Sequence, residues 1–324
     1  MKKLLLGSAL AASVLLAGSS FAETKISGYL ETTYNSKSTT TTGTPDNSGP
    51  ANIGHETGIY LKTSKDLSNG LGMSAGFGLV DGVNEDQFLT LSSGNTSFSV
   101  GNDVSGVADN VSHEDFTPNV AQDIHLTGVG GVDDVESVHG FNGLYLKHKG
   151  DMLTLEGVYA PTTNADNATA ASTNSESAGS GYDLAVHGNF GIEGLKVGYG
   201  VSEKQADSSS VANSDVEGKA MGIMYSINGL TVGVGKVTNT ASALDTENTS
   251  YGISYQVNDQ ITLAVTGGQQ EKDGAAHDTD YITYQIGYDF GGLGVTAGWY
   301  TVENSGYVSG ADQDVFEIRT VTKF

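Results

Sequence analysis

Residues 60–77 read YLKTSKDLSNGLGMSAGF, and they contain two short alternating runs joined by a polar break at Asp66–Gly70. Alternation of apolar and polar residues with a period of two indicates β-strands, and the Asn-Gly pair in the break favours a turn. One face of the second run is apolar, with Leu71, Met73, Ala75 and Phe77. The other face is almost free of side chains, with Gly72, Ser74 and Gly76. We therefore expect a β-hairpin whose two faces meet different surroundings.

The N-terminus has the features of a bacterial secretory signal peptide. Lys2 and Lys3 precede an apolar stretch over residues 4–18, and Ser20-Phe21-Ala22 supplies a small-x-small cleavage site. A membrane-spanning helix needs roughly 20 apolar residues, so this stretch is short for the alternative of an uncleaved anchor. We expect residues 1–22 to be a signal peptide and residues 23–324 to form one mature domain.

The mature chain is acidic and contains no cysteine. Removing residues 1–22 takes two of the 15 basic residues and none of the 38 acidic ones, so the formal charge changes from −23 to −25. Such a charge disfavours nucleic acid as a partner. The absence of cysteine in the sequence excludes disulfides, thiol catalysis and cysteine-ligated metals. With 45 glycines and 37% hydrophobic residues, an ordinary packed core is also not expected.

The alternating pattern of the opening stretch recurs along the mature chain. Tight turns are predicted at 66–70, 93–96, 150–151, 191–194, 228–229, 258–259 and 291–292. Longer connections are predicted at 36–53, 80–86, 102–139, 161–179, 205–216, 241–248, 272–278 and 304–312. Seven turns and eight longer loops join sixteen strands. This arrangement is typical of an all-β protein, a transmembrane antiparallel β-barrel with short periplasmic turns and long extracellular loops.

Alternation alone is also compatible with a soluble β-sandwich, in which the apolar face packs on a second sheet. Two features favour the barrel. Strands of about ten residues, tilted near 45°, match the thickness of a bilayer. Aromatic residues of the apolar face also occur near strand ends, where an interfacial girdle would lie, at Tyr34, Tyr159, Tyr182, Phe190, Tyr251, Phe290 and Phe316. The apolar face is then expected to meet lipid, and Gly72, Ser74 and Gly76 are expected to face the channel and leave room for permeating molecules.

The sequence resembles the Gram-negative general porins. The run Tyr60–Leu71 is similar to an early hairpin of that family, where Lys-Gly-(Ser/Thr)-Glu-Asp-Leu-Gly-Asn-Gly-Leu is typical. Residues Phe88–Gly101 are similar to the next hairpin, and the C-terminal phenylalanine is a family trait. The resemblance covers the whole mature chain. It departs from the family in the last strand, where Thr320 and Thr322 occupy places that are usually aromatic or aliphatic.

The resemblance implies a water-filled channel for small hydrophilic solutes and ions in the outer membrane of a Gram-negative bacterium, in lipid contact and as a homotrimer. It also implies that the loop over residues 102–139 folds inward and narrows the channel. That loop has no Lys or Arg, and the acidic constriction residues expected there are Asp103, Asp109, Glu114, Asp115 and Asp123. Because an acidic passage concentrates cations, we predict a cation preference. Candidate basic residues of the pore wall are Lys25, Lys62, Lys147 and Arg319.

Alternatives remain at this point. A secreted acidic β-rich adhesin or surface-layer protein would share the composition, and it would be soluble without detergent. A substrate-specific channel would need a binding track such as an aromatic slide, and no such series is visible. An enzyme would need a nucleophile and a positioned histidine, and none of the seven histidines lies in a recognisable motif. We expect no enzyme, no cofactor and no dedicated metal site, although acidic loops could bind Ca²⁺ adventitiously.

Overall fold

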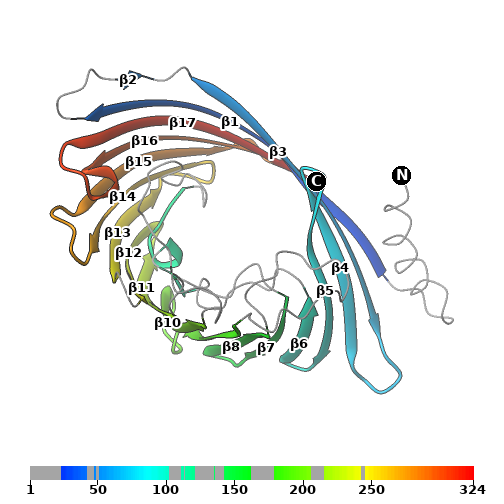
Figure 1. The fold of residues 1–324 in the computed structure, drawn as a ribbon. Coiled ribbons are helices and arrows are strands. Elements are labelled where there is room, and N and C mark those ends of the chain that lie inside the picture. The colour runs from blue at the N-terminus through cyan, green and yellow to red at the C-terminus, as the bar shows by residue number, and fades with distance from the viewer. Residues whose placement is uncertain are drawn as a thin grey trace.

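The structure is a computed structural model that describes residues 23–41, 47–48, 51–101, 111–112, 114–120, 135, 142–161, 179–205, 215–241 and 245–324. The described strands form one antiparallel sheet of sixteen long strands and the two-residue strand β2 (Asn47–Ser48). Figure 1 shows these strands curving around a common axis. The all-β prediction is therefore confirmed.

The sheet closes on itself through its first and last strands. β1 (Glu23–Thr41) pairs with β3 (Asn52–Asp66) on one side and with β17 (Ala311–Lys323) on the other. Two backbone hydrogen bonds complete the seam, because Gly28 N donates to Phe324 O at 2.9 Å and Phe324 N donates to Gly28 O at 3.0 Å. A closed sheet leaves no unpaired edge, which is the condition for a β-structure that spans lipid.

Each of the remaining long strands pairs with the strands before and after it in the sequence. They are β4 (Gly72–Val80), β5 (Val83–Ser93), β6 (Thr96–Gly101), β7 (Gly143–Lys149), β8 (Leu153–Ala160), β9 (Gly181–Gly188), β10 (Leu195–Lys204), β11 (Val216–Ile227), β12 (Leu230–Ala241), β13 (Thr246–Gln256), β14 (Ile261–Lys272), β15 (Thr279–Asp289) and β16 (Leu293–Glu303). The predicted tight turns fall between these strands.

Three sequence predictions about these strands need correction. The connection predicted at 80–86 is a tight turn, because Asp81 and Gly82 both take positive φ, 48° and 80°, and β5 begins at Val83. The first strand extends to Thr41, into the stretch predicted as the connection at 36–53. Gly76 was also expected to leave room in the channel for permeating molecules. The space on its inner side is instead filled, because a Cβ there would lie 2.9 Å from Cζ of Phe88. That glycine accommodates a neighbouring ring, not a solute.

Alternation along the strands gives the sheet an apolar outer face and a more polar inner face. On β13, β14 and β15 the outward side chains Ile253, Val265 and Ile286 are 46%, 37% and 48% exposed. On β3, Ile59 is 46% exposed, so Leu61, two residues farther on, also faces outward. Cross-strand neighbours share a face, so the pairing of Leu61 with Phe77 places Phe77 outside as well. This agrees with the expected face of the opening hairpin.

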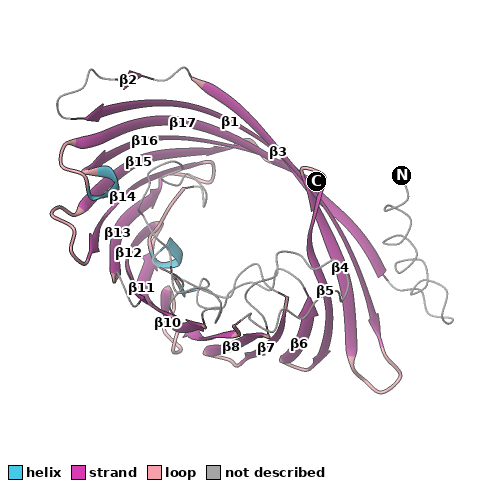
Figure 2. Ribbon diagram, viewed as in Figure 1, coloured by secondary structure: helices cyan, strands magenta, loops and turns pink. Residues whose placement is uncertain are grey.

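Helical structure in the described residues includes the short 3₁₀ helices η2 (Glu114–Phe116) and η3 (Ser305–Tyr307). Figure 2 shows η2 inside the ring of strands. Within the described part of the chain, no helix combines the length and apolar character needed to cross a membrane.

Candidate functional site

A segment of the loop that joins β6 to β7 lies against the inner wall of the barrel. Its described part includes Val111–Ser112 and Glu114–Val120, and it meets side chains or backbone of β10, β11, β12, β13 and β15. Every contacted position belongs to the inner face of its strand, because the neighbouring residues Tyr199, Ile223 and Tyr251 are exposed on the outer face. The loop therefore folds into the barrel, as the resemblance implies.

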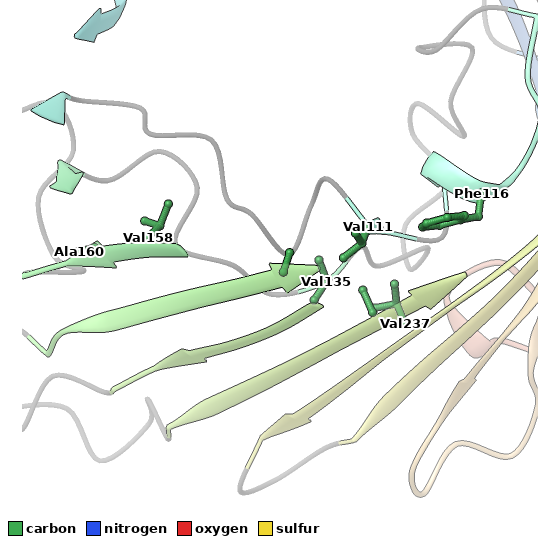
Figure 3. Packing of buried hydrophobic residues seen from close by; sticks show 8 residues of the cluster. Val111, Phe116, Val135, Val158, Ala160 and Val237 are labelled. Carbon is green, nitrogen blue, oxygen red and sulfur yellow. The ribbon is translucent and has the colours of Figure 1, made fainter. Parts of the chain in front are cut away.

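Phe116 is the apolar anchor of this segment. Its side chain is completely buried and belongs to a small hydrophobic cluster that also contains Val111 (Figure 3). The ring lies over Gly198 of β10 and Gly222 of β11, where a Cβ on Gly198 would lie 2.6 Å from Cζ of Phe116 and a Cβ on Gly222 would overlap the ring. Backbone O of Phe116 similarly occupies the space above Gly233 of β12. These glycines form a seat that admits the loop only because they carry no side chains.

Hydrogen bonds continue the attachment beyond the ring. Oγ1 of Thr117 lies 2.7 Å from Oγ of Ser250 on β13, and both residues are buried. Farther along, the backbone N–H of Val120 donates to Oε1 of Gln285 on β15 at 2.8 Å. Each such bond contributes about 1 kcal/mol, so the buried ring is the larger single term.

A lysine of the wall holds the acidic end of the same segment. Nζ of Lys196 on β10 donates to the backbone O of Asp115 at 2.9 Å and lies 3.3 Å from its Oδ1. The ammonium also lies 4.8 Å from the centre of the Phe116 ring, within cation–π range. Asp115 is thus paired with a cation of the wall.

The other predicted acidic constriction residues are placed only in part. Asp103, Asp109 and Asp123 lie outside the described residues. Glu114 begins η2, next to Asp115. That these carboxylates together line the constriction therefore stays a prediction from sequence.

The predicted basic residues all lie on inner-face positions, and Lys147 and Arg319 each pair with a carboxylate on a neighbouring strand. Nζ of Lys147 on β7 lies 2.6 Å from Oε1 of Glu156 on β8, and Nε2 of His187 on β9 lies 3.3 Å from the same oxygen. The Arg319 guanidinium forms an ion pair with Glu31.

The remaining two basic residues lie near the tight-turn end of the barrel. Lys25 pairs with Glu23 at 3.1 Å, and its side chain is 73% exposed. Lys62 is opposite Lys25 in the β1–β3 register, and its ammonium lies 5.8 Å from the centre of the Phe88 ring. The four residues do not form one row, and their role at the constriction stays a prediction.

Sequence reasoning missed the residues that attach the loop, Lys196 and Phe116, as well as the lumen carboxylate Glu156. Lys196 could have been found from the strand pattern. It lies three positions before Tyr199 on the same strand, so the two side chains point to opposite faces, and Tyr199 points outward. The Phe116 seat could not, because it depends on glycines of three strands. Among the described residues, no group of three or more His, Cys, Asp or Glu is arranged to hold a metal ion.

Comparisons with known proteins agree with this geometry. The sequence profile of a family described as Gram-negative porin matches residues 9–266. Among solved structures, OmpF of Salmonella typhi in complex with daunomycin is 16% identical with a TM-score of 0.67, covering 94% of this chain and 98% of that one. The trimer form of OmpT of Vibrio cholerae is 15% identical with a TM-score of 0.59, covering 94% and 99%. An anion-selective porin of Comamonas acidovorans is 11% identical with a TM-score of 0.64, covering 94% and 100%. No curated protein matches the chain.

Proposed function

Because the chain belongs to the Gram-negative porin family and is therefore a β-barrel channel of the outer membrane, we propose that small hydrophilic solutes and ions cross it by passive diffusion, with a preference for cations. The observation that supports this best is the loop segment at Glu114–Val120, which attaches to the inner wall of a closed barrel of sixteen long strands. A barrel of this size is too wide for wall side chains to fill, so an attached loop narrows a water-filled passage without closing it.

The cation preference follows from the balance of charges. The sequence carries a formal charge of −23, and its loop over residues 102–139 contains no Lys or Arg. In the described part of the wall, Lys147, Lys196 and Arg319 each lie against a carboxylate, so their positive charges are largely compensated. A negative field in a narrow passage attracts cations and repels anions. The fold alone does not decide the sign, since the similar porin of Comamonas acidovorans is anion-selective.

Planar-bilayer recordings in a KCl gradient test both parts of the proposal. We expect discrete conductance steps and a reversal potential whose sign reports K⁺ selectivity. A reversal potential that favours chloride would remove the cation preference and leave the channel intact. Swelling of protein-loaded liposomes in neutral sugars tests solute passage independently, and an absence of swelling would contradict free diffusion.

We also propose that the protein works without catalysis or a cofactor. The family and the barrel support a channel, and its transport step requires no bond to form or break. Binding of Ca²⁺ would then be adventitious, through acidic loops. Equilibrium dialysis against Ca²⁺, followed by recordings with and without chelator, tests this, because a dedicated site would bind stoichiometrically and change the conductance. The family and the closed barrel do not favour the alternative of a secreted adhesin or surface-layer protein.

A homotrimer is the assembly we propose, in contact with outer-membrane lipid over the rest of its surface. Its support is a polar patch on the outer face at the β17–β1–β3 seam, formed by Thr32, His55, Thr57, Thr320 and Thr322. Within the patch, Oγ1 of Thr32 lies 3.0 Å from Nδ1 of His55. Polar groups that face lipid are costly, so a neighbouring protein surface is the better cover. Mass measurement in detergent should give three chains per particle, and single-chain particles would contradict the trimer.

Export to the outer membrane requires a leader, and we propose that residues 1–22 serve as a cleaved signal peptide. These residues lie outside the described part of the structure. N-terminal sequencing of protein extracted from membranes should begin at Glu23. A chain that retains Met1 would contradict this proposal.

A further inference from the structure

We propose that Lys196 is a positioning and selectivity-determining residue of the channel: it holds the constriction loop in place and cancels the charge of Asp115. This inference rests on the proposed channel function and refines it. Asp115 is then a structural partner of the wall, and its negative charge contributes little to the ion selectivity.

Lys196 reaches three groups of the loop at once. Its ammonium donates to the backbone O of Asp115 at 2.9 Å, lies 3.3 Å from the Asp115 carboxylate, and lies 4.8 Å from the centre of the Phe116 ring. One ammonium thus contacts a peptide carbonyl, a carboxylate and a ring face on two consecutive residues. Replacing it loses all three contacts together.

Its place on the wall explains how it reaches them. Lys196 and Gly198 are two residues apart on β10, so both point inward. Gly198 pairs with Gly222 under the Phe116 ring, and Lys196 pairs with Met224 in the row next to it. The backbone of Lys196 therefore lies on the side of the glycine seat nearer the turn between β9 and β10, and its ammonium extends from there over the Phe116 ring.

The charges of Lys196 and Asp115 can affect ions in the channel because both side chains are partly exposed to solvent. The Lys196 side chain is 34% exposed and the Asp115 side chain is 25% exposed. Partly exposed ion pairs contribute little to stability by themselves, so the carbonyl and ring contacts carry much of the positioning. Removal of the lysine charge would nevertheless take away the positive charge that Lys196 places beside the Asp115 carboxylate. A unit charge about 5 Å from the ion path, screened by about 0.1 M salt, changes local cation and anion concentrations about twofold in opposite directions.

Reversal potentials of matched variants test the charge part of the proposal. Lys196→Met should raise the ratio of K⁺ to Cl⁻ permeability about fourfold relative to wild type. Asp115→Asn should lower the ratio, because it leaves the lysine uncompensated, and the double variant should return close to wild type. Lys196→Arg keeps the charge and should preserve the ratio. Equal shifts in the same direction for the two single variants, or an unchanged ratio in Lys196→Met, would overturn the proposal.

A control lysine separates this effect from a general loss of positive charge. Lys236 forms an ion pair with Glu247 between neighbouring strands, as Lys196 does with the loop, but both residues lie on the outer face. Lys236→Met should therefore leave the permeability ratio unchanged. All shifts are measured relative to wild type, so they hold even if the wild-type channel prefers chloride.

Attachment of the loop to the wall can be measured by disulfide cross-linking, independently of channel conductance. Because the sequence has no cysteine, Thr117→Cys with Ser250→Cys places one thiol pair where the two hydroxyls lie 2.7 Å apart. Disulfide formation between them reports how often the loop occupies its seat. Adding Lys196→Met should slow this reaction severalfold, while Lys236→Met should not. An unchanged rate would show that Lys196 does not position the loop, whatever the channel conducts.

Discussion

Replacement of Phe116 with alanine tests whether the aromatic ring keeps the loop on the wall. The ring is completely buried on Gly198 and Gly222, whereas the loop contacts that follow it are single hydrogen bonds. Truncating a buried phenylalanine costs about 3–5 kcal/mol, and each 1.4 kcal/mol is a factor of ten. The equilibrium between attached and detached loop should therefore shift roughly 100- to 4,000-fold toward the detached form. The barrel strands are not part of this change, so the protein should still fold and insert.

Single-channel recording measures the result. With the loop detached for part of the time, the Phe116→Ala channel should show a noisier current with additional conductance levels. Oxidising a Thr117→Cys and Ser250→Cys pair in the same variant should restore one quiet level, and reduction should remove it. The reasoning would be refuted by a Phe116→Ala channel as quiet as wild type, because the hydrogen bonds would then suffice to hold the loop.

Two further predictions concern the wall. Gly222→Ala places a Cβ inside the Phe116 ring and should reproduce the noisy current, whereas Gly54→Ala, at an inner-face position with nothing within 4 Å of the added Cβ, should conduct as wild type; equal behaviour of the two would contradict the glycine seat. Arg319→Met removes the cation that pairs with Glu31 in a partly buried position of the β1–β17 seam. It should lower the temperature to which samples must be heated before the barrel unfolds and its gel mobility changes. Adding Glu31→Gln should recover much of that loss, and a double variant no more stable than the single one would argue against the ion pair.

The fold could be predicted from the sequence because the alternation within each barrel strand shows which side chains face outward and which face inward. Alternation assigns each residue to a face, and turns such as Asn228-Gly229 can be recognised by residue types that tolerate positive φ. The tight turn at Asp81-Gly82 was misread, since the polar residues after it suggested a longer loop although they belong to β5. Local patterns thus sufficed for the strands and failed where a strand itself is polar.

The candidate site was harder to predict because it depends on contacts between distant segments. Lys147 was expected on the inner wall, but its partner Glu156 is known only once β7 and β8 are in register. The seat of Phe116 similarly requires glycines of β10 and β11 to be adjacent. Acidic residues were read as free charges, yet Asp115 pairs with Lys196, which is separated from it by 81 positions. Counting charges along the sequence therefore overstated what this residue contributes to the field.

The central claim is that a closed sheet surrounds a water-filled passage through the outer membrane. Its most direct test is the conductance of single channels in planar bilayers as the KCl concentration is raised. We predict discrete steps whose size rises nearly in proportion to the conductivity of the bulk solution, as ions moving through water would give. Purified protein that inserts without any conductance, or steps that do not change with salt, would contradict the claim.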